Sequence, residues 1–253
     1  MTVTHELDWE KIRAKARSEA WARDFVRVLK ETCHSRMEVW PHDPPMEQSE
    51  WTHYYFCNDD AARLSFDFKK SGEHECPKCG KIYRGHPWDG AWRSIVHGSL
   101  VANMERAAIL ARIEPEPERY VEYLRRLVLF YAEHYEGYAV HGERAGKGKI
   151  MPQCLDESIV LISVGRYLSW GRGQNWFSER EMQLLREKWF RPAVELLKPQ
   201  IGKIHNIHVW MQSAMATAAQ WLGDRALLEW SIESEFGWKR QIELGDEGGR
   251  FLV

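Results

Sequence analysis

The feature that most constrains the fold is a helical repeat of apolar residues that runs from Trp92 almost to the last residue. Apolar side chains recur three or four positions apart, which gathers them on one face of a helix. The spacing predicts helices over 94–112, 118–135, 155–170, from Ser178 with a kink or restart at Pro192, over 206–222 and over 225–236. Because short loops join most of these segments, we expect antiparallel helical hairpins and a mainly α fold.

Two helix ends carry sequence markers. Ser178 followed by Glu181 is the pattern of a capping box, which predicts the start of a helix at this point. Gly223 suits the left-handed residue that commonly ends a helix, here the one predicted over 206–222.

The first 90 residues do not follow this repeat. Residues 8–36 predict a charged amphipathic helix, and 37–51 predict a proline-rich loop. The runs HYYFC and RLSFDF, and the end of HECPKCGKIY, are typical of short strands. We therefore expect an amino-terminal helix and linker over 1–50, a β-rich, zinc-ribbon-like knob over 51–90, and a helical portion over 91–253.

Composition excludes some classes of function. Apolar residues make up 44% of the chain and the net charge is −2, which does not suit a general nucleic-acid binder or a membrane-surface protein. No stretch approaches the 18 apolar residues of a membrane helix, and the start lacks the apolar core of a signal peptide. We expect a cytoplasmic protein, or a periplasmic one if a leader has been removed.

A cysteine motif in the knob predicts a structural zinc site. Cys76-Pro-Lys-Cys79-Gly80 lets two thiolates face one tetrahedral ion, and Cys57 stands upstream at ribbon-like spacing. Asp60 and His74 compete as the fourth ligand, with His53 a weaker candidate. The alternative is a reduced, metal-free thiol pair. A thioredoxin-like pair is disfavoured because no βαβ pattern surrounds it.

Short loops join most of the predicted helices, but two loops, over 138–154 and 199–206, are long. Long loops on a helical scaffold are where a site is expected. The first is glycine-rich and basic, and Gln153 at its end opens the next helix. Its candidate ligands for the carboxylates or sulfates of an anionic partner are His141, Arg144, Lys147, Lys149 and Gln153. The alternative is a solvated loop. Asp156 and Glu157 suit the dipole of a helix start and are not predicted to be catalytic.

Three aromatic residues near these segments have two interpretations. Trp88, Trp92 and Tyr138 are candidate platforms for stacking sugar rings, and core packing is the alternative for each.

Three stretches together resemble one group of proteins: YYFCNDDAARLSFDF…HECPKCGKIYRGHPWDGAWR, YAEHYEGYAVHGERAGKGKIMPQCLDES and KIHNIHVWMQSAMA. Over roughly residues 50–245 the chain is similar to heparinase II/III-like and alginate-lyase-like polysaccharide lyases. The resemblance implies an (α/α) toroid followed by an antiparallel β-sandwich, with the catalytic groups between them. Because no strand-rich half follows GDEGGRFLV, we expect an incomplete toroid that corresponds to the amino-terminal part of such an enzyme.

The resemblance also implies a chemistry and a site. In β-elimination a base removes the carbon-5 proton of a uronate while a donor or cation neutralises the carboxylate. Asn206 matches the asparagine of the related motif N-x-x-V-W-H-N-A-A, and His208, Trp210 and Gln212 follow it. The chain departs from the motif where Met211-Gln212 replaces His-Asn, so His208 is the remaining candidate base, or activity is impaired.

The residues themselves allow another interpretation of this segment. His205, His208 and Gln212 share a helical face, and they are also consistent with a polar stripe in which Asn206 is a plain helix cap.

We therefore expect a uronate polysaccharide lyase or the toroid fragment of one, whose partner is an acidic polysaccharide. A non-catalytic acidic-glycan-binding or scaffold protein is the alternative. A toroidal glycoside hydrolase would need a carboxylate pair such as Asp89 and Asp156, whose spacing is not distinctive.

Overall fold

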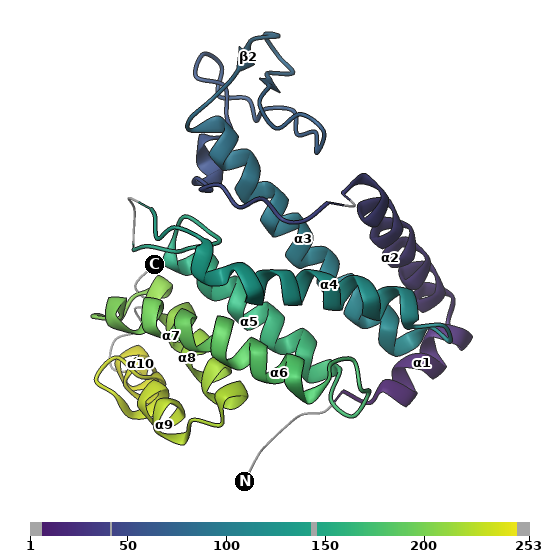
Figure 1. Ribbon diagram of the computed structural model, residues 1–253, viewed down its shortest axis with the longest axis vertical. Helices are drawn as coiled ribbons and strands as arrows, with labels where there is room; N and C mark the ends of the chain where they lie inside the picture. Colours follow the sequence, from purple (N-terminus) through teal and green to yellow (C-terminus); the bar gives the residue numbers. More distant parts are fainter. Residues whose placement is uncertain (1–6, 41, 143–145, 247–253) are drawn as a thin grey trace.

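The computed structural model describes residues 7–40, 42–142 and 146–246, and these form a mainly helical protein (Figure 1). The α-helices are α1 Trp9–Ser18, α2 Ala20–Val39, α3 Trp88–Ile113, α4 Glu118–His134, α5 Cys154–Trp170, α6 Glu179–Leu185, α7 Arg191–Leu197, α8 Asn206–Leu222, α9 Arg225–Glu233 and α10 Trp238–Asp246. Short 3₁₀ turns lie at Thr52–Tyr54, Tyr135–Gly137 and Lys198–Gln200. The mainly α prediction is confirmed.

Several predicted boundaries are close to the observed ones. Helices α4, α5 and α8 begin and end within one residue of the predicted limits. The capping box forms, since the Ser178 hydroxyl accepts from the Glu181 N–H at 3.3 Å and the Glu181 carboxylate accepts from the Ser178 N–H at 2.7 Å. Gly223 has a φ of +68° directly after α8, the left-handed conformation that glycine adopts most readily.

Pro192 marks a restart rather than a simple kink. A π-helical turn spans Arg186–Phe190, and α7 follows with Pro192 in its first turn. Proline has no N–H to continue the hydrogen-bond ladder, so the preceding turn widens and a new helix begins.

The predicted helix over 8–36 was wrong in its continuity. It is broken at Glu19, whose backbone is extended with φ −97° and ψ 131°. Contacts with distant helices hold α1 at its own angle: the Trp9 ring meets the Trp170 ring at 5.9 Å, and the Arg13 side chain donates to the Arg112 carbonyl at 3.2 Å. A periodic pattern cannot indicate such a break, because both halves keep helical spacing.

The knob is less β-rich than predicted. Its sheet has two strands, β1 His74–Glu75 and β2 Ile82–Tyr83, which pair antiparallel with His74 opposite Tyr83. The run RLSFDF contributes a single bridge, between Phe56 and Arg63. Turns around the cysteines take up the backbone hydrogen bonds that longer strands would have used. Helix α10 was not predicted.

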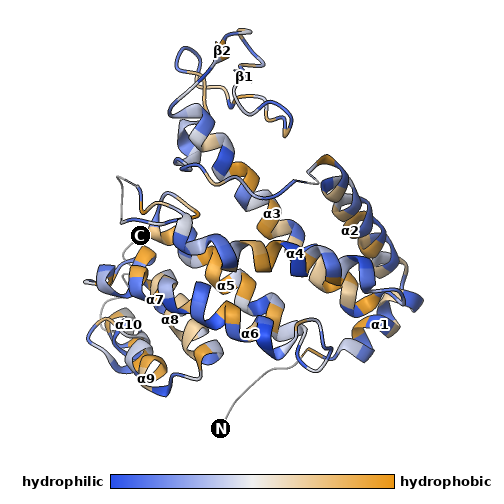
Figure 2. Cartoon of the chain, in the orientation of Figure 1, coloured by the Kyte–Doolittle hydropathy of each residue, from blue (hydrophilic) through white to orange (hydrophobic). Residues whose placement is uncertain are grey.

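Helix α3 connects the knob to the helical body, and it packs against α2, α4 and α5 (Figure 1). Its apolar residues alternate with polar ones so that the orange faces of α3, α4 and α5 meet inside, whereas the knob is largely hydrophilic (Figure 2). Helices α5 and α8 approach closely because Gly165 has no side chain, and the Trp221 indole donates to the Gly165 carbonyl at 3.2 Å.

Much of the unusual tryptophan content is explained by this core, which includes Trp92, Trp176, Trp189 and Trp221. Within the described ranges, no helix combines the length and the apolar character needed to cross a bilayer.

Candidate metal centre and candidate glycan-binding face

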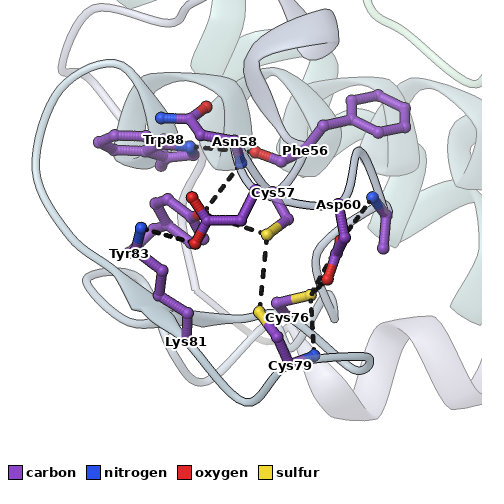
Figure 3. A network of polar contacts seen from close by, with 11 residues as sticks. Phe56, Cys57, Asn58, Asp60, Cys76, Cys79, Lys81, Tyr83 and Trp88 are labelled. Atoms are coloured by element: carbon purple, nitrogen blue, oxygen red, sulfur yellow. Dashed lines mark hydrogen bonds and ion pairs between the residues drawn. The ribbon is translucent and has the colours of Figure 1, made fainter.

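Four ligand-type side chains converge in the knob (Figure 3). The ligand atoms of Cys57, Asp60, Cys76 and Cys79 all lie within 4.8 Å of one another. The Cys57 and Cys79 sulfurs are 3.7 Å apart, and the Cys76 sulfur lies 3.4 and 3.5 Å from the two Asp60 oxygens. A disulfide requires about 2.05 Å between sulfurs, so the 3.7 Å pair is not one.

Of the two competing fourth ligands, the structure brings Asp60 to this group and holds His74 away from it. The His74 ring is fully buried, with Nδ1 3.0 Å from the Tyr55 hydroxyl and Nε2 3.0 Å from the Asp89 carboxylate. His74 therefore ties the small sheet to the first turn of α3. His53 also lies outside the group and stacks on Trp51 with 4.0 Å between ring centroids.

The pKa values of Cys57 and Cys79 in the knob are shifted in opposite directions. Burial raises the pKa of Cys57, but hydrogen bonds from the Tyr83 hydroxyl and from backbone N–H groups outweigh it, so that this pKa is lowered. The Lys81 N–H lowers the pKa of Cys79, yet its neighbours Cys76, Cys57 and Asp60, with burial, raise it to about 11. The Cys79 thiol is therefore harder to ionise than an ordinary cysteine, and a cation beside it would favour its thiolate.

The loop between α4 and α5 is organised by Glu157, which sequence reasoning assigned to the helix dipole. Glu157 is 2% exposed and accepts hydrogen bonds from the Tyr135 hydroxyl at 2.7 Å and the Met151 N–H at 2.9 Å. Burial raises the pKa of Glu157, and these hydrogen bonds partly offset that effect. A sequence signal existed: Glu157 stands beside Ser158 at helical spacing from the buried residues Cys154 and Leu161.

Two of the predicted basic ligands in this loop are used internally. His141 is buried, with Nδ1 2.9 Å from the Ala139 carbonyl and Nε2 3.1 Å from the Ser49 hydroxyl. The Lys149 ammonium donates to the carbonyls of Tyr135 and Glu136 at 3.1 and 3.0 Å, which caps the end of the preceding helix. Both side chains therefore bind the backbone of their own loop, and their role as ligands of an acidic glycan stays a prediction.

The remaining predicted residues of the loop differ in position. Lys147 is exposed, Gln153 is half-buried at the start of α5, and Arg144 lies outside the described residues. Gln200 joins this loop to the second one: its side chain accepts from the Lys147 N–H at 2.7 Å and donates to the Lys147 carbonyl at 3.1 Å. The two long loops are therefore neighbours, and nothing in the sequence identified Gln200 as the link.

The start of α8 presents part of the predicted lyase site to solvent. Asn206 is exposed and Trp210 is 46% exposed, while His208 is half-buried between them. Gln212 points elsewhere: it is buried and donates to the Phe236 carbonyl at 3.2 Å. Its predicted position on an open face was wrong, because the segment after α9 covers that side of the helix. Met211, at the position of the related histidine, is fully buried.

The hydrogen bonds of His208 define its tautomer. Its Nδ1 accepts from the N–H groups of Gly202 and Lys203, both at 3.3 Å. Burial, with the positive charge of Lys203, lowers the pKa of His208, so the ring is neutral near pH 7. A neutral ring that accepts at Nδ1 carries its proton on Nε2 and is a donor there. His208 in this state can hold a carboxylate through its Nε2–H.

Asn206 is the first residue of α8 and not its capping residue, which differs from the alternative interpretation of Asn206 as a plain helix cap. His205 is the capping residue of α8, and its Nδ1 accepts from the Ile207 N–H at 3.3 Å. The Asn206 amide oxygen accepts from the same N–H at 2.8 Å, which leaves the amide N–H donors for other partners.

The candidate sugar-stacking residues belong to the interior. Trp92 and Tyr138 are buried, and their polar atoms donate to the carbonyls of Asp67 and Pro45. Trp88 packs against Tyr83 with 4.7 Å between ring centroids. Core packing, the alternative interpretation, therefore applies to Trp92 and Tyr138, and Trp88 anchors the knob on α3.

Comparison with known proteins gives one informative relationship. No known protein-family profile matches the chain. The chain is similar to a Stenotrophomonas maltophilia (strain K279a) protein named alginate lyase, with 29% identity over 135 residues. The alignment covers 49% of this chain and 18% of that protein. This similarity relates the chain to a polysaccharide lyase, and the chain corresponds to only a small part of that protein's length.

Proposed function

We propose that this chain is part of a polysaccharide lyase and that the start of α8 binds the uronate units of an acidic polysaccharide. The similarity to the protein named alginate lyase carries the proposal. The exposed Asn206 and Trp210, with the half-buried His208 between them, supply a consistent surface, and Lys203 lies beside His208. An (α/α) toroid is the arrangement we propose for the helices.

The chemistry of this surface suits an anionic sugar. The Asn206 amide and the Nε2–H of His208 are hydrogen-bond donors for a uronate carboxylate, and the free N–H groups of a helix start favour negative charge. The Trp210 ring offers an apolar face on which a sugar ring can stack. Neutralising the carboxylate is what makes the carbon-5 proton removable.

In the complete reaction a base takes the carbon-5 proton, a carbon-4–carbon-5 double bond forms, and the carbon-4–oxygen bond breaks. The leaving oxygen then needs a proton from an acid other than His208, because a neutral ring that gave up its Nε2 proton would become an imidazolate. The base comes from elsewhere, since Nε2 of His208 already carries a proton and Met211 is buried.

One observation favours a binding role without catalysis as the second candidate. The pair Met211-Gln212 replaces the expected His-Asn, and both of these side chains are buried away from the exposed face. A face that retains its donors but lacks a base would bind the polymer and leave it intact.

The test of the lyase proposal is the ultraviolet absorbance of the unsaturated uronate product. The full chain is incubated with alginate, heparan-type and other uronate polymers, with a neutral glucan as the control. We expect binding to at least one uronate polymer and weak elimination or none from this chain alone. Equal binding of the neutral glucan and the uronate polymers would contradict the proposed site, and rapid elimination would contradict our assignment of His208 as a donor alone.

A further inference from the structure

The knob contains two turns of the same geometry, although only one is a recognisable cysteine knuckle. In the recognisable turn, the Cys76 N–H donates to the Lys81 carbonyl at 2.8 Å and the Gly80 N–H donates to the Cys76 carbonyl at 2.9 Å. In the other, the Cys57 N–H donates to the Ala62 carbonyl at 2.8 Å and the Ala61 N–H donates to the Cys57 carbonyl at 3.0 Å. Each bond in one turn has its counterpart at the same spacing in the other.

The backbone dihedral angles strengthen this correspondence. Gly80 follows Cys79 with a φ of +74°, and Ala61 follows Asp60 with a φ of +55°. A left-handed alanine is uncommon because its Cβ is crowded, so the surrounding turn must hold it there. Asp60 therefore occupies the position that a second cysteine takes in a paired-knuckle zinc site.

The distances between the four side chains match a tetrahedral ion. With zinc–sulfur bonds of about 2.3 Å, two sulfurs on one tetrahedron lie about 3.8 Å apart, and a sulfur and a carboxylate oxygen about 3.6 Å apart. The corresponding separations are 3.7 Å for Cys57 to Cys79 and 3.4 to 3.5 Å for Cys76 to Asp60. These two separations fit two edges of one tetrahedron, and all four ligand atoms lie within 4.8 Å of one another.

Surrounding hydrogen bonds hold the sulfurs in place. The Cys76 sulfur accepts from the N–H groups of Lys78 and Cys79 at 3.4 and 3.5 Å. The Tyr83 hydroxyl lies 3.1 Å from the Cys57 sulfur and accepts from the Asn58 N–H at 2.9 Å (Figure 3). Because its oxygen already accepts a hydrogen bond, the Tyr83 hydroxyl is oriented to donate to the Cys57 sulfur. Groups that donate to the ligand atoms of a metal commonly hold those atoms in place in this way.

We infer that Cys57, Asp60, Cys76 and Cys79 bind one Zn²⁺ in a tetrahedral structural site, with Asp60 rather than His74 as the fourth ligand. Three thiolates select a soft or borderline ion, and zinc accepts a carboxylate oxygen in the fourth position. Four protein ligands leave no open position, so the ion stabilises the knob on α3 and does not take part in catalysis.

The experiment measures zinc and cobalt binding by the full chain and three variants. Wild-type protein purified without chelator should contain close to one zinc per chain by elemental analysis. His74→Gln should retain one zinc per chain. The variant is expected to be less stable than the wild type, because the buried contact between His74 and Asp89 is lost. Asp60→Ala should weaken zinc binding by at least about tenfold in competition with a chromogenic chelator, because one of four ligands is lost.

Asp60→Cys keeps the proposal testable should the other variants fold poorly. It completes a four-cysteine site, so we expect zinc binding at least about tenfold tighter than in the wild type. With Co²⁺ in place of zinc, the thiolate charge-transfer absorbance should rise by about a third as three thiolates become four. The inference fails if folded wild-type protein binds neither ion, or if His74→Gln releases zinc while Asp60→Ala retains it.

Discussion

At the scale of single residues, His97 shows what burial does to an ionisable side chain. It is fully buried, with Nδ1 2.8 Å from the Tyr131 hydroxyl and Nε2 without a hydrogen-bond partner among the described residues. Burial is the main cause that lowers the pKa of His97 from 6.5 to about 3, and the neighbouring His141 and Arg93 side chains add to it. The folded protein therefore keeps this ring neutral in a pH range where the unfolded chain protonates it.

This difference predicts a pH dependence of stability. Between pH 6.5 and about 3 the unfolded state binds one more proton at His97, so the free energy of unfolding falls as the pH falls. The contribution has a slope of at most about 1.4 kcal/mol per pH unit. In urea titrations from pH 7 to 4.5, His97→Phe should show a shallower decline than the wild type. His86→Gln, which changes an exposed histidine, should not. Parallel curves for wild type and His97→Phe would contradict the assignment.

Glu157 leads to a second prediction about one residue. Glu157→Gln replaces a carboxylate that accepts from Tyr135, Met151 and Lys149 by an amide with a single acceptor oxygen. At least one buried donor then faces an N–H group, at a cost on the order of 1–3 kcal/mol. We expect the free energy of unfolding to fall by that amount and amide exchange at Met151 to accelerate. The control is Asp156→Asn at the preceding residue in the same turn of α5, and equal effects of the two changes would count against this role.

At the scale of helices, the contact between α5 and α8 depends on one glycine. A Cβ at Gly165 would lie 2.3 Å from the Thr217 methyl group and 3.1 Å from the Trp221 indole nitrogen. Gly165→Ala should therefore push the helices apart and lower stability by about 1–3 kcal/mol. Gly98→Ala is the matched control, because a Cβ there meets nothing within 4 Å and alanine favours the helix by up to about 1 kcal/mol. Thermal unfolding of both variants should show opposite shifts, and a shared direction would contradict the packing argument.

The helices also show what could be predicted from the sequence. Local signals were sufficient for α4, α5, α8, the Ser178 capping box and the Gly223 helix end, because periodicity and capping act within a few residues. They were insufficient for the break at Glu19 and for the burial of Gln212. In those cases the decisive partners, Trp170 and Phe236, are distant in sequence.

In the candidate sites, too, local features were predictable from the sequence, and features that depend on distant residues were not. The cysteines were predictable from their spacing, but the choice of Asp60 over His74 required the backbone geometry of two turns. The two long loops were predictable from the sequence, whereas their contact through Gln200 and the internal use of His141 and Lys149 depend on backbone groups that carry no sequence signal.

At the scale of the whole molecule, the proposed zinc site and the proposed glycan face lie in different parts of the protein. The knob is attached to α3 through Trp88 and the His74–Asp89 pair, whereas Asn206 and His208 stand at the start of α8 in the helical body. Removing zinc from the full chain should therefore unfold the knob first. Amide exchange is expected to rise over residues 55–85 while that of α5 and α8 stays slow. Uniform loss of protection across all helices would contradict this separation.

The most direct test of the proposed function is the binding of a defined uronate oligosaccharide, measured by calorimetry at two salt concentrations. Wild-type protein should bind oligouronate more tightly than a neutral oligosaccharide of equal length, and the affinity should fall as salt rises, because charges on a solvent-exposed face are screened. The double variant Asn206→Ala with His208→Ala should lose most of this binding, whereas His86→Ala should retain it. Undiminished binding by the double variant, or equal affinity for the neutral sugar, would contradict the placement of an acidic-glycan site at the start of α8.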